Sequence, residues 1–280
     1  MRAFLLRLWE TWLGEPFRKI EADSLAYRLS DDGRRIDWKT PIVLLTAAAC
    51  LTLQQYTANT GQLISTARFV ANTFGGPTAA NEVEATLRRW GNDQLASRVW
   101  WAGVSVFTYA VIPLLILKFG FRARISDYGL KVRGVFNAWP LYVLFVVVMV
   151  PIVWVCSAEE RFQQTYPFMR FGSPEEVRAQ LWKWELAYAA QFVGLEFFFR
   201  GFIVHGTKHR FGVYAVFVSM VPYVQIHFGK PMPEAVASII AGVVLGFMSL
   251  ATRSVWLGAA LHIGVAWGMD CACLARRGLL

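Results

Sequence analysis

The sequence predicts an all-α fold, a polytopic bundle of transmembrane helices. Of the 280 residues, 56% are hydrophobic and only 17% are charged. Apolar runs of about twenty residues, long enough to cross a hydrocarbon core of ~30 Å as a helix, recur along the whole chain. The sequence lacks the alternation over about ten residues that marks membrane strands. We expect seven spans, with eight as the alternative, near residues 40–57, 99–118, 136–156, 181–205, 212–228, 233–251 and 255–275.

The basic residues predict how the bundle is oriented. Residues 1–40 carry eight Lys and Arg and the connection 118–135 carries five, whereas 57–97 and 157–180 carry three each over longer stretches. Because Lys and Arg gather in cytoplasmic loops, seven spans place the N-terminus in the cytoplasm and the C-terminus outside. These loops account for the net charge of +9, so we expect the lipid bilayer, and no nucleic acid, as a partner. No cleaved signal peptide is evident, which fits a bacterial cytoplasmic (inner) membrane.

The chain divides into three parts. Residues 1–39 are expected to form a cytoplasmic amphipathic segment. Within it, four apolar residues between 2 and 13 follow helical spacing, which predicts either a helix lying on the membrane surface or one packed against the bundle. Residues 40–179 then supply the N-terminal transmembrane helices with their extramembrane loops. Residues 180–280 form the core that carries the polar residues described below.

The fourth span has a clear start signal. Ser173 can cap the helix, Pro174 suits its first position, and Glu176 completes the capping pattern. The helix is therefore predicted to begin near Pro174 and to run past Phe202, which makes it longer than the bilayer is thick.

Two further local patterns predict structure. Asn81 and Glu84 have the spacing of a capping box, which marks a helix start in the segment 81–91. In the sixth span, Gly242 and Gly246 form a small-xxx-small face that allows another helix to approach closely.

The fourth span carries two charges inside an apolar run, residues 189–203. Charged residues at this depth are costly and usually functional. Glu196 and Arg200 are four residues apart, so they share a helix face and can pair directly. The structural alternative is that they neutralise each other and hold a helix contact. His205 and His209, at the cytoplasmic end of the same span, are expected to be ordinary interfacial residues.

Two histidines lie in later spans. Tyr223 and His227 are four residues apart on the fifth span, which Pro222 bends and Gly229 ends soon after. His262 lies about two turns into the seventh span. A lone histidine in such a position more often makes a hydrogen bond between helices than takes part in catalysis.

Together these residues indicate hydrolytic chemistry. A carboxylate in a low-dielectric site can act as a general base on water, and histidines can hold that water or stabilise an oxyanion. Zinc is the competing use of two histidines and a glutamate, but no His-Glu-x-x-His pair lies on one helix. We therefore expect neither a metal nor another cofactor.

The polar residues form three motifs in series: Glu196-Phe-Phe-Phe-Arg200-Gly201, Tyr223-x-x-x-His227 and His262. In order and spacing, residues 180–275 resemble the CPBP intramembrane proteases, the CAAX-protease and bacteriocin-processing proteins also called the Abi family. The N-terminal half carries no motif of that family.

The resemblance implies a glutamate-dependent endopeptidase that hydrolyses a peptide bond within or beside the bilayer. Glu196 would activate water, His227 and His262 would position it and stabilise the oxyanion, and Arg200 would orient the carboxylate. The substrate would be a protein or peptide, with or without a lipid. Eukaryotic members of the family trim the last three residues from prenylated proteins.

The chain departs from the family pattern at three positions, of which Tyr223, in place of phenylalanine, is a mild change. Leu195 stands where the family has the first glutamate of a pair, and Ala266 stands where it has asparagine or a similar residue. Either Glu196 acts alone, or another carboxylate reaches the site; the candidates are Glu185, Glu234 and Asp270.

The alternative function is that of a non-catalytic member of the family, a pseudoprotease acting as scaffold, regulator or immunity factor. A transporter would show two similar halves with broken helices at matching positions, which this sequence does not.

Overall fold

The computed structural model describes residues 10, 14–91, 94–132, 135 and 139–280. In this part of the chain every regular element is a helix, and the only β-type pairing is an isolated bridge between Leu130 and Ser254. The all-α class is therefore confirmed. The first helices are α2 (Glu15–Leu29), α3 (Asp31–Arg34), α4 (Lys39–Thr57), α5 (Thr60–Gly91), α6 (Gln94–Val106), η2 (Phe107–Val111), α7 (Ile112–Leu115), η3 (Ile116–Gly120) and η4 (Ile125–Tyr128). They are followed by α8 (Trp139–Cys156), α9 (Glu160–Thr165), α10 (Pro174–Glu196), η6 (Phe197–His205), α11 (Gly206–Phe211), η7 (Gly212–Tyr214), α12 (Ala215–Gln225), α13 (Met232–Thr252) and α14 (Trp256–Arg276).

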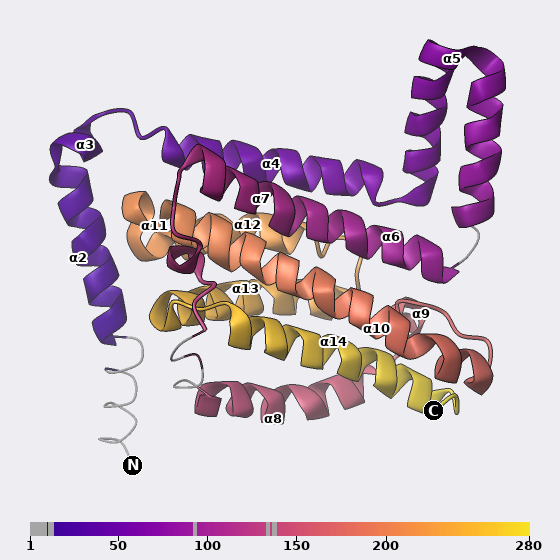
Figure 1. Cartoon of the computed structure of the whole chain (residues 1–280). Coiled ribbons are helices and arrows are strands. Elements are labelled where there is room, and N and C mark those ends of the chain that lie inside the picture. The colour runs from indigo at the N-terminus through magenta and orange to yellow at the C-terminus, as the bar shows by residue number, and fades with distance from the viewer. Residues whose placement is uncertain (1–9, 11–13, 92–93, 133–134, 136–138) are drawn as a thin grey trace.

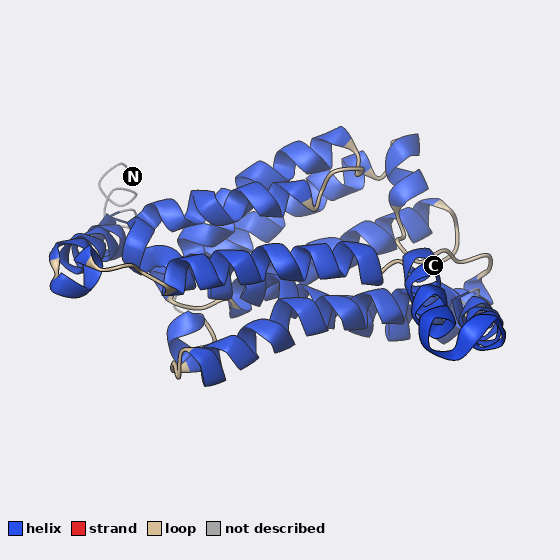
Figure 2. Ribbon diagram, turned by 90° about the horizontal axis from the view of Figure 1, so that it is seen from above, coloured by secondary structure: helices blue, strands red, loops and turns tan. Residues whose placement is uncertain are grey.

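The long helices lie alongside one another, and two elements cross their direction at opposite ends (Figure 1). Helix α2 crosses at one end and α5 rises at the other, and the C-terminus lies at the end opposite α2 (Figures 1 and 2). Helix α14 lies between α10 and α8 and packs against both (Figure 1). The run from α10 through η6 is the most enclosed, which suits the segment that carries Glu196 and Arg200.

Four of the described helical segments are long and apolar enough to cross a membrane: 94–120, 174–225, 232–252 and 256–276. A fifth is added if α4 and α5, bent by 92° at their junction, count as one broken span. Helix α8 contains a shorter apolar stretch, Tyr142–Cys156. Each of the seven predicted spans contains a helix, so the polytopic class is confirmed, while the number of crossings stays a prediction.

The start of α10 follows its capping signal. Ser173 is the N-cap, its hydroxyl oxygen accepts a hydrogen bond from the Glu176 backbone N–H at 3.3 Å, and Pro174 is the first helical residue. The prediction for this helix is confirmed. The helix start predicted at Asn81 is wrong, because Asn81 lies inside α5, whose break is at Gly76 (φ +75°) before Pro77.

Just after Glu196 the helix widens into the π-helical segment η6. Its aromatic residues are all fully or almost fully buried: Phe197, Phe198, Phe199 and Phe202. Gly201 permits a close contact there, since a Cβ at this position would come within 2.7 Å of the Tyr128 carbonyl oxygen. π-helical turns occur often at functional sites, and this one contains Arg200.

Beyond α11 the chain turns at Gly212 (φ +58°), and α12 packs back along η6. Helix α13 then packs closely on α12, as the glycine pattern predicted. A Cβ at Gly246 would come within 2.6 Å of a Val216 methyl group, and one at Gly242 within 3.2 Å of the Tyr223 ring. The two glycines therefore let α13 approach α12 and fix the position of Tyr223.

We predict that Gly246→Leu destabilises the protein by about 1–3 kcal/mol, because added volume in a packed contact forces helices apart. Gly264→Leu is the matched control, since a Cβ at Gly264, also on a long apolar helix, meets no atom within 4 Å. Thermal unfolding in detergent micelles measures both variants. Equal loss of stability in the two would contradict the close contact.

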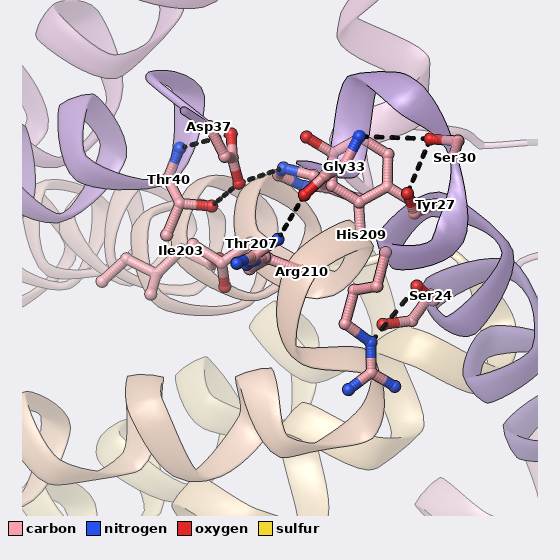
Figure 3. Close-up of polar contacts among 11 residues, drawn as sticks. Ser24, Tyr27, Ser30, Gly33, Asp37, Thr40, Ile203, Thr207, His209 and Arg210 are labelled. Carbon is pink, nitrogen blue, oxygen red and sulfur yellow. Dashed lines mark hydrogen bonds and ion pairs between the residues drawn. The ribbon is translucent and has the colours of Figure 1, made fainter. Parts of the chain in front are cut away.

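The segment α2–α3 is attached to the end of the bundle by polar contacts (Figure 3). Asp37 Oδ1 accepts a hydrogen bond from the Thr40 backbone N–H at 3.3 Å. Its Oδ2 accepts one from the Thr40 hydroxyl at 2.6 Å and lies 3.0 Å from His209 Nε2. Arg210 donates to the Gly33 carbonyl oxygen at 3.0 Å. His209 is thus not merely an interfacial residue, because it joins α11 to the N-terminal segment. The surface helix predicted for residues 2–13 lies outside the described residues, apart from Glu10.

The Asp37 contacts give this attachment a pH dependence. Burial by itself raises the pKa of the Asp37 carboxyl, but the Thr40 hydrogen bonds and the charge of His209 more than offset it, so the pKa lies below its ordinary value. A carboxyl with a lowered pKa stabilises the folded state above its unfolded pKa and loses that contribution as the pH falls through the folded value.

We therefore predict that hydrogen-exchange protection of residues 15–40, corrected for intrinsic rates, decreases below about pH 4. Asp37→Asn should show the reduced protection already at neutral pH, with little further change on acidification. Asp32→Asn, at an exposed position of α3, is the control. Unchanged protection in Asp37→Asn at neutral pH would show that the carboxylate does not hold the segment.

Candidate active site

Glu196 ends α10 in the interior of the bundle, where its side chain is 1% exposed. One carboxylate oxygen, Oε1, is hydrogen-bonded to His262 Nδ1 at 2.9 Å and forms an ion pair with Arg200 Nη1 at 3.2 Å. The other oxygen, Oε2, is buried and has no hydrogen-bond partner among the described protein groups. The carboxylate is therefore fixed through one oxygen and keeps the second for another group.

Arg200 lies one turn further along, in η6, and its side chain is 2% exposed. Its guanidinium pairs with Glu196, lies 4.1 Å from the centroid of the Tyr223 ring, and makes a long 3.4 Å contact to the Ala241 carbonyl oxygen on α13. The positive charge offsets the cost of burying the carboxylate, and the ring face adds a cation–π contact.

His262 brings the last helix to this pair. Its Nδ1 donates to Glu196, and its ring lies against the Phe192 ring at 4.3 Å between centroids. At 16% exposure its side chain is the most accessible of the three. The start of α14 can approach Glu196 closely because residue 258 is glycine. A Cβ at this position would be only 3.3 Å from Glu196 Oε2.

His227 is connected to Arg200 and His262 through Tyr223. Its Nδ1 donates to the Tyr223 carbonyl oxygen at 2.8 Å, and its ring lies 4.8 Å from the Tyr223 ring. The same Tyr223 ring lies 6.3 Å from the His262 ring and under the Arg200 guanidinium. The structure thus brings Glu196 into contact with both Arg200 and His262. His227, His262 and Arg200 all lie around the ring of Tyr223.

The hydrogen bonds fix which ring nitrogens carry protons. A carbonyl oxygen only accepts, so His227 Nδ1 must be protonated, and in a neutral ring Nε2 then holds a lone pair. His262, whose Nδ1 donates to a carboxylate, has the same tautomer. Both Nε2 atoms can accept a hydrogen bond from water, and either becomes a donor only when its ring is doubly protonated.

The three other candidate carboxylates lie elsewhere. Glu185 is eleven residues before Glu196 on one helix, about 16 Å along its axis, and Asp270 is eight residues after His262, about 12 Å. Asp270 accepts from the Trp184 indole at 2.9 Å and the Phe168 backbone N–H at 3.1 Å.

Glu234 is engaged by Tyr166 at 2.7 Å and Lys230 at 2.6 Å. In the described part of the chain, Glu196 is thus the only carboxylate in contact with Arg200 or His262. Leu195, in the position of the family's first glutamate, is packed in the apolar core.

His205 differs from its expected interfacial place. It is buried, with Nε2 at 3.0 Å from the Ser249 hydroxyl and Nδ1 at 2.9 Å from Lys208 Nζ. Because an ammonium only donates, Nδ1 accepts and Nε2 carries the proton. His205 is therefore a structural link between α11 and α13. Within the described residues, no three His, Cys, Asp or Glu side chains are placed so that they could hold a metal ion.

The sequence pattern does not reveal the role of Gly258 or the full role of Tyr223. The motif pairs Tyr223 with His227, but its ring also lies against the Arg200 guanidinium and 6.3 Å from the His262 ring. Gly258 gave no signal, because a single glycine in an apolar helix usually reflects packing, and its approach to Glu196 depends on how two distant helices cross.

The fold and the site define a class: a helical membrane protein with a buried glutamate, arginine and histidine in contact across helices. Residues 177–268 match the family model described as type II CAAX prenyl endopeptidase Rce1-like. This segment is thus similar to Rce1-like endopeptidases, which is consistent with the CPBP family, and it contains all four predicted site residues. A search among curated proteins and one among solved structures gave no match to the chain.

We predict that the Glu196–Arg200 pair is held as a unit. Arg200→Met leaves a buried carboxylate without its counter-charge and should cost about 3–5 kcal/mol of stability. The double variant Glu196→Gln/Arg200→Met removes both charges and should unfold at a higher temperature than Arg200→Met alone. Arg178→Met, which breaks the exposed Arg178–Glu175 pair, is the control and should leave stability unchanged. A double variant as unstable as the sum of both single changes would refute the coupling.

Proposed function

We propose that the Rce1-like domain is an intramembrane endopeptidase in which Glu196 activates water. The observation that carries this proposal is the asymmetry of one buried carboxylate. Glu196 Oε1 is fixed by His262 and Arg200, while Oε2 has no protein partner among the described residues. A carboxylate arranged in this way can take a proton from a water molecule without losing its orientation.

The reaction would proceed as a general-base hydrolysis. Glu196 Oε2 takes a proton as the water oxygen bonds to the carbonyl carbon of the scissile peptide, which forms a tetrahedral oxyanion. The carbon–nitrogen bond then breaks, and the proton passes from Glu196 to the leaving amine. Water is consumed, a carboxylic acid and an amine are formed, and Glu196 returns to its starting state.

The histidines would have distinct roles. His262 holds Glu196 through Nδ1, and its Nε2 can accept a hydrogen bond from the attacking water. His227 can position water through Nε2 in its neutral form, whereas support of the oxyanion requires its doubly protonated form, because only that form donates from Nε2. Arg200 stays paired with Glu196 and balances the charge of the site.

The substrate would be a membrane-associated protein or peptide, and the family description favours CAAX-type processing of a lipidated C-terminus. We assign catalysis to residues 180–280, support by transmembrane helices and extramembrane loops to residues 40–179, and attachment at the membrane surface to residues 1–39. We propose that the N-terminus lies in the cytoplasm, on the distribution of Lys and Arg, and that the membrane is a bacterial inner membrane.

The test is cleavage of a farnesylated CAAX peptide with a fluorophore and a quencher on either side of the bond, by protein reconstituted in vesicles. Glu196→Gln keeps the shape of the side chain but removes the base, so we predict a loss of at least about 10²-fold in kcat/KM. His262→Ala and His227→Ala should also lose activity. Glu185→Gln, a buried carboxylate on the same helix, is the control and should cleave as wild type does.

Two results would contradict the proposal. Full activity in Glu196→Gln would exclude Glu196 as the base. Absence of cleavage by the wild type, with this peptide and with unlipidated peptides, would favour the non-catalytic alternative that Leu195 and Ala266 suggest.

A further inference from the structure

Helix α5 forms an arm that stands away from the bundle. It begins three residues after α4 ends, and the chain bends by 92° at this junction (Figures 1 and 2). The break at Gly76 and Pro77 reverses the direction, so residues 60–75 and 77–91 form two antiparallel halves. Arg68 on the first half pairs with Glu84 on the second at 2.5 Å, which ties the halves together.

The length of α4 indicates where the arm lies relative to the membrane. Lys39–Thr57 has 19 residues, about 28 Å along its axis, which is close to the ~30 Å hydrocarbon core of a bilayer. With α4 as the first span, as the sequence predicts, a helix that leaves its end at a right angle runs parallel to the membrane plane, at the depth of the interface. Tyr56, at this end of α4, is 59% exposed, as an aromatic residue in an interfacial belt would be.

The two halves of the arm differ in composition. Residues 60–75 contain one charged residue, Arg68, which is neutralised by Glu84. This half exposes three large apolar side chains: Phe69, Val70 and Phe74, the last 87% exposed. Residues 77–91 contain two glutamates and two arginines. In Figure 1 the 60–75 half lies nearer the middle of the bundle's length than the 77–91 half.

We propose that the arm lies flat in the interfacial layer of the bilayer, with Phe69, Val70 and Phe74 inserted among the lipids and the 77–91 half facing water. An amphipathic element in this plane binds through its buried apolar area and through attraction to anionic lipid. The arm carries three arginines and two glutamates, a net charge of +1. Burial of its apolar side chains therefore contributes more to membrane binding than charge attraction does, and binding does not require anionic lipid. This inference does not depend on the proposed protease activity.

The experiment places the photoreactive residue p-benzoylphenylalanine at position 74 or 69 of the full chain, reconstituted in phosphatidylcholine vesicles. Val147, 63% exposed on the apolar helix α8, is the positive control for a lipid-facing position, and Arg88 on the second half of the arm is the negative control. After irradiation, mass spectrometry identifies the adducts. We expect lipid adducts at positions 69 and 74 in yields similar to those at 147, and almost none at 88.

Vesicles that also contain phosphatidylglycerol separate apolar insertion from charge attraction, and the adduct yields at 69 and 74 should not change. Three outcomes would overturn the proposal: adducts at 69 and 74 to a second copy of the chain or to its own bundle, no adducts there while position 147 reacts, or adducts that appear only with the anionic lipid. Because the readout is contact with lipid, it is unaffected by whether the protein cleaves peptides.

Discussion

The ion pair between Glu196 and Arg200 is the interaction on which the site depends. Neither charge could be buried alone at this depth without a large cost, so each needs the other. The pair also needs its neighbours, since Glu196 contacts His262 on α14 and Arg200 contacts Tyr223 on α12. The pair at the α10–η6 junction therefore connects α10 and η6 to α12 and α14. The arrangement of the candidate catalytic residues depends on these contacts.

The packing around the pair relies on small residues at close contacts. Gly242 and Gly246 let α13 approach α12, and Gly258 lets the start of α14 approach the Glu196 carboxylate. The aromatic residues of η6 fill the space on the remaining sides. In a bilayer, helices gain little from hiding apolar surface from lipid, so close packing and interhelical polar contacts must hold them together. The same contacts that stabilise this bundle thus position the polar residues.

The sequence predicted the features that depend on local spacing. Apolar runs predicted the helices, Ser173 and Pro174 predicted the start of α10, and the four-residue separation predicted the Glu196–Arg200 contact. The association of this pair with His262 was predicted from the polar residues shared by three apolar spans, and then from the resemblance to a family. Features that depend on the angle and position at which two helices cross could not be predicted. The sequence of one helix does not specify which residues of another helix its side chains contact. The multiple contacts of the Tyr223 ring and the burial of His205 belong to this group. The arm had a local signal, Gly75-Gly76-Pro77, for its turn, but nothing local encodes its right angle to α4.

The central claim is that Glu196 Oε2 is the atom that activates water. An experimental structure in lipid, at a resolution that shows ordered water, tests it most directly. We expect a water molecule within about 2.6–3.2 Å of Glu196 Oε2, and within reach of an Nε2 atom of His262 or His227, while Oε1 keeps its contacts to His262 and Arg200. A structure in which an apolar side chain covers Oε2, or in which His262 lies apart from Glu196, would contradict it.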